Sequence, residues 1–213
     1  MRSRALLACA LLGMVVATPR PSHAFDELAA RERIGARTGG LLTTGDLHKA
    51  YGDGWQVTLF FHEKVASWFL VDFRLGALYL GALKYKTLDD LLTSRAGITS
   101  SMRILYFSAG PMFGWPLGGS WSMHAGGGVG VYSVSIVFDA PTTGYNFSDQ
   151  DIGFSGSAGV ESRLGEKWCV DASATAHYVM ITKNINDVYY AFTNGGGSPV
   201  ILDIAVGVTL DLR

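Results

Sequence analysis

The stretch WCVDASATAHYVM, residues Trp168 to Met180, alternates strictly between two kinds of side chain. The polar parity holds Asp171, Ser173, Thr175 and His177, and the apolar parity holds Val170, Ala172, Ala174, Ala176 and Tyr178. A period of two predicts a β-strand whose two faces meet different surroundings. The fold therefore depends on which face of this strand meets water.

The same alternation recurs along the chain, whereas helical periodicity is scarce. Segment 102–113 is apolar on both parities, so its register stays open. Eight segments are predicted to be strands: 33–42, 55–63, 69–80, 102–113, 121–132, 152–164, 168–180 and 200–212.

The N-terminus has the pattern of a secretory signal peptide. Arg2 and Arg4 precede an apolar run, and Ser22-His23-Ala24 supplies small residues for cleavage. We expect residues 1–24 to be the signal peptide, 25–32 a short lead-in, and 33–213 one β-barrel domain. A retained membrane anchor is disfavoured because the run is too short to span a bilayer.

Composition excludes several other classes. Cleavage would remove three arginines and no acid, leaving 14 basic and 18 acidic side chains. This balance does not favour nucleic acid as a partner. Cys169 would be the single remaining cysteine, so no internal disulfide is expected. No other apolar run approaches the length of a membrane helix. An exported chain of this kind is either a soluble domain or a membrane β-barrel.

The predicted connections alternate in length. HEKVAS, PLGGS and GEK are short, whereas the connections at 43–54, 84–100, 138–151 and 181–198 are long. Short turns at one rim and long loops at the other are typical of outer-membrane barrels.

The two parities indicate which face is enclosed. Lysine is almost absent from the strands, and the polar parity is rich in Ser, Thr and Gly. Small hydrogen-bonding side chains suit the narrow interior of an eight-stranded barrel. The apolar parity then faces lipid, and the sheet must close because backbone groups in lipid need partners.

Aromatic residues on the apolar parity mark the expected edges of the membrane. Trp168 and Tyr178 lie ten residues apart, as do Phe69 and Tyr79. In a tilted strand this spacing covers roughly 25 Å, the height of the apolar band. The predicted membrane-interface aromatics are Trp55, Phe69, Tyr79, Trp121, Phe154, Trp168 and Tyr178.

These features resemble the bacterial outer-membrane β-barrel domain family, the small eight-stranded barrels similar to OmpA, OmpX and the opacity proteins. The resemblance covers about residues 30–213 and is carried by GGLLTTGDLHKAYGDGW, SMHAGGGVGVY, DIGFSGSAGVESRLGEKWCVDASATAHYV and ILDIAVGVTLDLR. It implies an all-β, eight-stranded antiparallel transmembrane barrel in the bacterial outer membrane, with short periplasmic turns and long extracellular loops. One departure is the ending Leu212-Arg213, where such barrels usually carry an aromatic that the insertion machinery reads.

Charged and imidazole side chains on the inward parity are the candidate lumen network. An internal set of ion pairs is favoured over a proton pathway or a selectivity ring, because buried charges must be paired. The predicted members are Arg33, Arg37, Asp72, Arg74, Glu161, Arg163, Asp171, His177 and Asp203.

No catalytic residue, metal site or cofactor is predicted. His177, Ser173 and Asp171 share one parity, but that parity faces inward, where lipid does not reach, and strand spacing keeps them beyond contact. The histidines have no metal-ligand spacing.

We therefore predict a non-enzymatic envelope protein with a structural, adhesive or surface-binding role. The expected partners are outer-membrane lipids, the barrel-insertion machinery and an extracellular ligand at the long loops, where Tyr189, Tyr190 and Phe192 are the binding candidates. Three alternatives stay open: a narrow channel or carrier for small molecules, polar or hydrophobic, a lipid A-modifying enzyme, and a soluble lipocalin-like binder.

Overall fold

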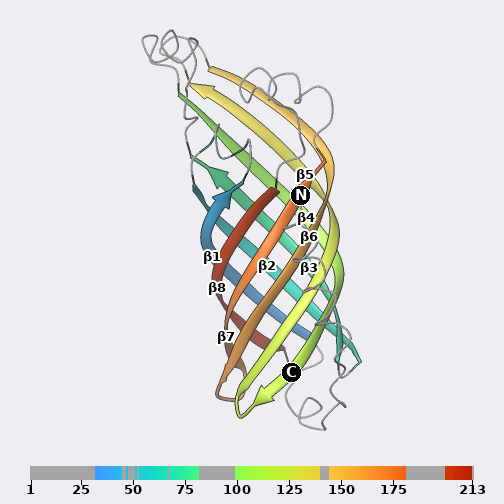
Figure 1. The fold of residues 1–213 in the computed structure, drawn as a ribbon. Coiled ribbons are helices and arrows are strands. Elements are labelled where there is room, and N and C mark those ends of the chain that lie inside the picture. Colours follow the sequence, from blue (N-terminus) through green and yellow to red (C-terminus); the bar gives the residue numbers. More distant parts are fainter. Residues whose placement is uncertain are drawn as a thin grey trace, which may run out of the picture.

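The computed structural model is a closed antiparallel β-barrel of eight strands, each hydrogen-bonded to its neighbours in sequence (Figure 1). It describes residues 32–44, 47, 51, 53–66, 68–81, 99–139, 144–180 and 200–212. The strands are β1 (Glu32–Thr43), β2 (Gly54–Ala66), β3 (Phe69–Leu80), β4 (Thr99–Gly118), β5 (Trp121–Asp139), β6 (Gly144–Leu164), β7 (Trp168–Val179) and β8 (Val200–Leu212). Within the described residues, no helix is long and apolar enough to cross a membrane.

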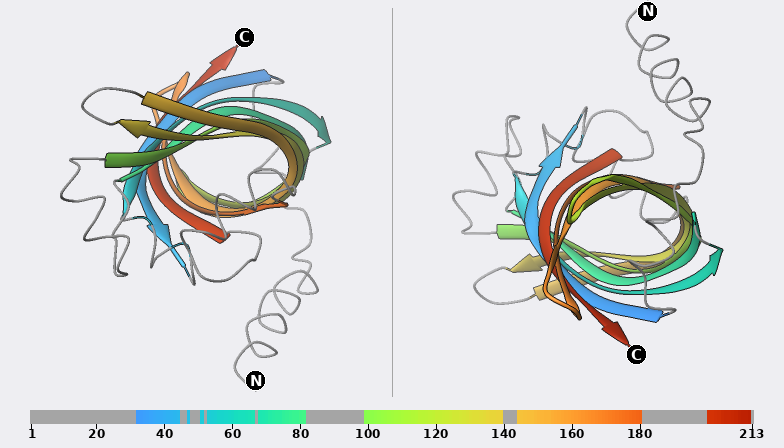
Figure 2. Two further views of the ribbon diagram at one scale, coloured as in Figure 1. Left: turned by 90° about the horizontal axis from the view of Figure 1, so that it is seen from above. Right: turned by 90° about the horizontal axis from the view of Figure 1, so that it is seen from below.

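Pairing of β1 with β8 closes the sheet, so the predicted eight-stranded antiparallel barrel is confirmed (Figure 2). Following the register once around the barrel from Arg33 leads back to β1 at Thr43, farther along the same strand. This offset is the shear of the barrel, and it makes the strands tilt by roughly 35–45° from the axis. A barrel of eight strands is just wide enough for side chains to fill its interior.

Short connections gather at one end of the barrel, which we call the turn rim. They join Ala66 to Phe69, Gly118 to Trp121 and Leu164 to Trp168. We call the other end the far rim. There, β5 and β6 extend beyond the shorter strands (Figure 1).

The prediction of a long connection at 138–151 is wrong. Strand β5 continues to Asp139, β6 begins at Gly144, and the pairing runs without a break from Val131–Ile152 to Asp139–Gly144. The sequence concealed this extension because the alternation reverses at Tyr132. Just beyond that point the inward side chains, Val134 and Ile136, are apolar, and the outward ones between them and Tyr132 are Ser133 and Ser135.

Strand β4 contains the same reversal, which explains its open register in the sequence. Met102, Ile104 and Tyr106 point inward and are buried, whereas Leu105 and Phe107 point outward and are exposed. The strand is apolar on both faces for two reasons. Near the far rim its inward side chains line an apolar interior, and in its middle its outward side chains form part of the exposed apolar surface.

The interior therefore has two halves of different chemistry, and the expectation of a polar lumen throughout is wrong for the half near the far rim. A cluster of buried apolar side chains fills that half, because several strands place apolar residues on the inward face there. Its members are Leu41, Leu47, Tyr51, Leu78, Leu80, Met102, Ile104, Tyr106, Tyr132, Val134, Ile136, Val179 and Ile201.

Inward glycines make room for large side chains in this narrow interior. A Cβ atom added at Gly76 would lie 2.5 Å from the ring of Tyr106, and one at Gly159 would lie 2.6 Å from Nε2 of His124. Glycine in a strand often marks such a close approach. These positions explain part of the high glycine content, because each one opposes a bulky inward residue.

Candidate functional site

The half of the lumen near the turn rim is filled by paired charges. Nε of Arg33 donates to Asp211 at 2.8 Å, and its terminal nitrogens donate to Glu161 at 3.0 and 3.1 Å. Arg163 donates to the second oxygen of Asp211 at 3.0 Å. Arg33 thus links two carboxylates from different strands, and Asp211 links two arginines.

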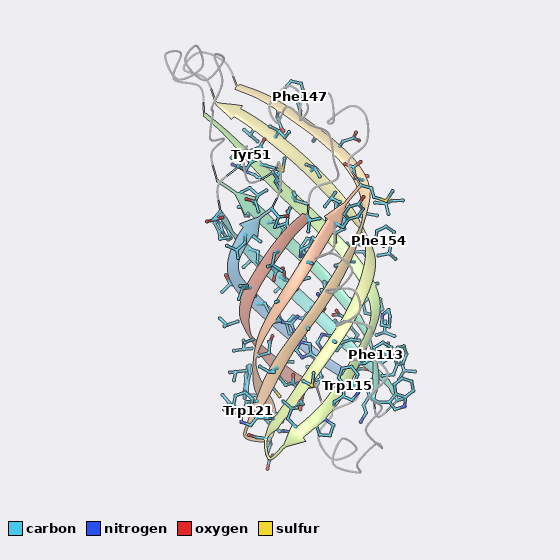
Figure 3. The ribbon with its side chains drawn as sticks, viewed as in Figure 1. Tyr51, Phe113, Trp115, Trp121, Phe147 and Phe154 are labelled. Atoms are coloured by element: carbon cyan, nitrogen blue, oxygen red, sulfur yellow. The ribbon has the colours of Figure 1, made fainter. Side chains whose placement is uncertain are left out.

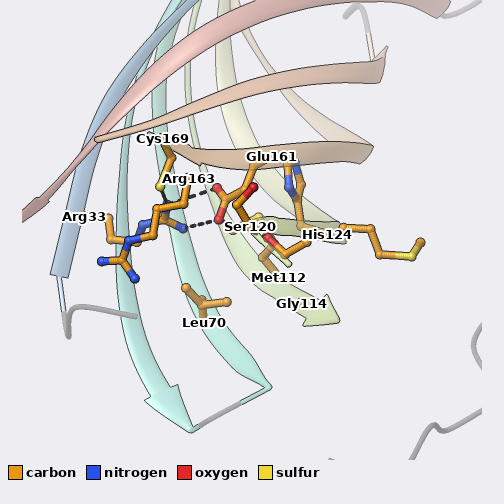
Figure 4. A pocket seen from close by; sticks show the side chains of 11 residues that line it. Arg33, Leu70, Met112, Gly114, Ser120, His124, Glu161, Arg163 and Cys169 are labelled. Carbon is orange, nitrogen blue, oxygen red and sulfur yellow. Dashed lines mark hydrogen bonds and ion pairs between the residues drawn. The ribbon is translucent and has the colours of Figure 1, made fainter. Parts of the chain in front are cut away.

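A small cavity opens beside this group at the turn rim (Figure 4). Its volume is about 30 Å³, which suits one water molecule or a few atoms. Arg33, Glu161, Arg163 and Cys169 lie in its wall, and the thiol of Cys169 accepts a hydrogen bond from Arg33 at 3.1 Å. His124 also lines this cavity.

A second ion pair lies deeper in the lumen. Nε of Arg37 donates to Asp171 at 2.6 Å, and both side chains are buried. The guanidinium also lies 4.2 Å from the centre of the Phe60 ring, where a cation is attracted by the aromatic face. Gly207 leaves the space for this pair, because a Cβ atom there would meet both Arg37 and Asp171.

Asp72 joins two strands at a comparable depth. It accepts a hydrogen bond from Nε of Arg74, and its other oxygen lies 3.1 Å from Nε2 of His62. A terminal nitrogen of Arg74 donates to Ser157 across the lumen at 2.7 Å. Buried charges are costly unless paired, and each of these has a partner.

A row of buried polar side chains marks the boundary between the two halves. His177 is fully buried, with Nε2 at 3.0 Å from Asp203 and Nδ1 at 3.2 Å from the hydroxyl of Tyr132. The hydroxyl of Tyr106 lies 2.8 Å from that of Thr58. Between this layer and the far rim, the lumen is filled by apolar side chains.

Two residues from the β1–β2 connection cover the apolar half. The amide of Tyr51 donates to the carbonyl of Leu47 at 2.8 Å. Both side chains are buried in the apolar cluster, and Tyr51 lies inside the barrel near the far rim (Figure 3). The lumen is therefore blocked by ion pairs near one rim and by packed apolar side chains near the other.

All nine residues of the candidate lumen network lie on the inward face, and each takes part in one of the charged contacts named above. Sequence reasoning missed Asp211, His62 and His124 as members. Their inward parity was the available signal, and Asp211 in particular alternates in step with Asp203 and Thr209.

The predicted interface aromatics all point outward and occur at two levels. Trp55 stacks on Tyr79 with ring centres 4.3 Å apart, and Phe154 pairs with Tyr178 on the neighbouring strand, all toward the far rim. Trp121, Trp168 and Phe69 begin their strands at the turn rim.

Sequence reasoning missed an aromatic group around Phe69. Trp68, Phe113 and Trp115 join it, and the parallel rings of Trp68 and Phe113 are 5.9 Å apart (Figure 3). Trp68 and Trp115 lie at strand ends, where alternation no longer indicated a face. The loop candidates Tyr189, Tyr190 and Phe192 lie outside the described residues.

Within the part of the chain that the structure describes, no three His, Cys, Asp or Glu side chains are arranged to hold a metal ion. The described residues provide ion pairs inside the barrel and a belt of exposed apolar side chains outside it.

Solved structures with the same architecture come from several bacteria. Neisserial surface protein A matches with a TM-score of 0.56 and 11% identity, over 86% of this chain and 98% of that protein. A major outer membrane protein of Thermus thermophilus matches with a TM-score of 0.57 and 14% identity, over 84% and 99%. The chain has the fold of the small eight-stranded outer-membrane barrels.

A third barrel of this kind is the attachment invasion locus protein Ail of Yersinia pestis, solved with the heparin analogue sucrose octasulfate. It matches with a TM-score of 0.50 and 13% identity, over 84% of this chain and 95% of that protein. No protein-family model matches the sequence, and no curated protein matches it significantly. At these identities the likeness is one of fold.

Proposed function

We propose that this barrel is a non-enzymatic protein of the bacterial outer membrane, exported through a cleaved signal peptide, with a structural and surface-binding role. The turn rim faces the periplasm and the far rim faces outside, as in barrels with short periplasmic turns. Support comes from the fold, from the exposed apolar side chains around the barrel, and from aromatic residues near both edges of that belt.

The sealed lumen is the observation that carries this proposal. A channel needs a continuous polar path, whereas here Tyr132, Ile104 and Ile136 pack across the half near the far rim. An ion entering from the turn rim would have to leave water without gaining new partners, which is costly. The described lumen therefore favours a scaffold over a channel or carrier.

The surface outside the membrane is the place for binding. Beyond Val131 and Ile152 the outward side chains of β5 and β6 change from apolar to polar, with Ser133 paired to Gln150 and Ser135 to Ser148. This change fits a sheet that leaves the lipid and continues into water. Binding would then involve this extension together with the connections at the far rim.

Conductance in planar bilayers tests the proposal. The refolded mature chain should insert and migrate as a compact, heat-modifiable species, yet add no current above that of the protein-free bilayer. A variant that empties the apolar half, Ile104→Gly with Ile136→Gly, serves as the positive control because it should open a leak. Discrete channels from the unmodified protein would contradict the proposal.

A further inference from the structure

We propose that the outward surface around Arg103 binds the headgroup of a phosphorylated glycolipid in the outer leaflet. The surface, which we call the Arg103 patch, comprises Trp55, Tyr79, Arg103, Ser133, Ser135, Ser148 and Gln150. The inference rests on the proposed membrane placement, and it adds a specific lipid class to that placement.

Arg103 is placed as a cation at the boundary of the apolar belt. It is exposed on the outward face of β4, two residues before Leu105, which is 56% exposed and apolar. Its guanidinium lies 5.9 Å from the centre of the Tyr79 ring, and Tyr79 stacks on Trp55. Among the described residues, no carboxylate forms an ion pair with Arg103.

This lack of a partner distinguishes Arg103 from the arginines of the lumen. Arg33, Arg37, Arg74 and Arg163 each donate to a carboxylate. An arginine with free donors, held against an aromatic ring, is suited to bind a phosphate through paired hydrogen bonds. The boundary of the apolar belt is where a lipid phosphate would lie.

Hydroxyl and amide groups continue the patch sideways from Arg103. In the register, Arg103 pairs with Ser135 and Leu105 pairs with Ser133. These serines pair in turn with Ser148 and Gln150 on β6. The result is a row of neutral donors and acceptors beside the cation, which suits the hydroxyl groups of a sugar.

Apolar side chains lie directly below this row. Leu105, Phe107, Val131 and Ile152 are all more than half exposed, and they point outward from β4, β5 and β6. Acyl chains packed here would bring a headgroup level with Arg103. A ligand that combines phosphate, sugar hydroxyls and acyl chains matches all three parts, whereas a simple phospholipid lacks the sugar.

Native mass spectrometry of the refolded protein in detergent tests the inference. The probes are bis-phosphorylated lipid A, phosphatidylglycerol and inorganic phosphate, and the readout is the fraction of barrel that carries each. The unmodified protein should retain lipid A about tenfold more strongly than phosphatidylglycerol. Arg103→Gln should remove most of that preference, because one charge-assisted contact accounts for about this factor.

Lys167→Gln is the matched control, since Lys167 is an exposed cation in a turn at the opposite rim. It should leave the preference unchanged, and Ser133→Ala with Ser135→Ala should reduce it without removing a charge. Equal retention of the two lipids by the unmodified protein would overturn the inference, and so would a normal preference in Arg103→Gln. Displacement of lipid A by inorganic phosphate would also overturn it, because the patch would then be a simple anion site.

Failure of the membrane placement gives a different result. If the proposed function is wrong, the chain forms no heat-modifiable species with any lipid, in any of the three variants or in the unmodified protein. A properly folded barrel without lipid A preference would refute only the Arg103 patch.

Discussion

At the scale of single residues, the narrow interior is filled by placing glycines next to large inward side chains. Gly76 lies under the ring of Tyr106, and Gly153 lies under that of Tyr132, so neither position tolerates a Cβ atom at its present spacing. Gly156 is different, because it points outward and nothing lies within 4 Å of an added Cβ atom. The two kinds of glycine are indistinguishable by composition alone, but their parity separates them.

Gly76→Ala should therefore destabilise the barrel by about 1–3 kcal/mol, the usual cost of an overpacked core. Gly156→Ala is the control, and it should be neutral or stabilising by up to about 1 kcal/mol because it restricts the unfolded chain. Urea unfolding in lipid vesicles, followed by tryptophan fluorescence, measures both. Equal destabilisation by the two substitutions would show that the ring of Tyr106 does not occupy this space.

The Arg37–Asp171 pair leads to a second prediction at this scale. Asp171→Ala leaves a buried guanidinium without its carboxylate, so the free energy of unfolding should fall by about 3–5 kcal/mol. The double variant Arg37→Met with Asp171→Leu should regain most of the loss, since no buried charge is left unpaired. The same unfolding assay applies. A double variant that is less stable than the single one would contradict this account of the pair.

At the scale of the strand, the period-two pattern predicted the faces of β7 and β8 residue by residue. It failed at β5 beyond Tyr132 because alternation reports only the contrast between two surroundings. Along β5 toward the far rim, the outer surroundings change from lipid to water and the inner ones from charged pairs to apolar packing. The outward side chains then become polar and the inward ones apolar, so the alternation is reversed. Strand β4 overlaps both regimes, so its sequence is apolar on each face. The ion pairs could be assigned to the lumen from parity, but their partners depend on the register around the closed barrel.

The reversal predicts where the outward surface of β5 leaves the membrane. Single cysteines at Ser135 and Val129, in a Cys169→Ala background, face the same side of one strand. A membrane-impermeant maleimide added to intact vesicles should label Ser135→Cys rapidly and Val129→Cys slowly. Similar labelling rates at both positions would mean that the strand does not cross a lipid boundary between them.

At the scale of the whole molecule, one assignment unites the observations. Exposed apolar residues surround the barrel, aromatic rings lie near both edges of this belt, and charges are paired inside. Closure of β1 on β8 satisfies the backbone groups that lipid would otherwise leave without partners. A soluble barrel with the same register would instead place its apolar parity inside.

Spin labels at Val170, Ala174 and Val206 test this assignment most directly, because all three side chains point outward between the two levels of aromatic residues. In reconstituted vesicles, collision with dissolved oxygen should be frequent and collision with a water-soluble nickel chelate rare, as expected in hydrocarbon. Frequent collision with the nickel chelate, or immobilised labels shielded from both reagents, would show that this face meets water or packed protein and would contradict the account.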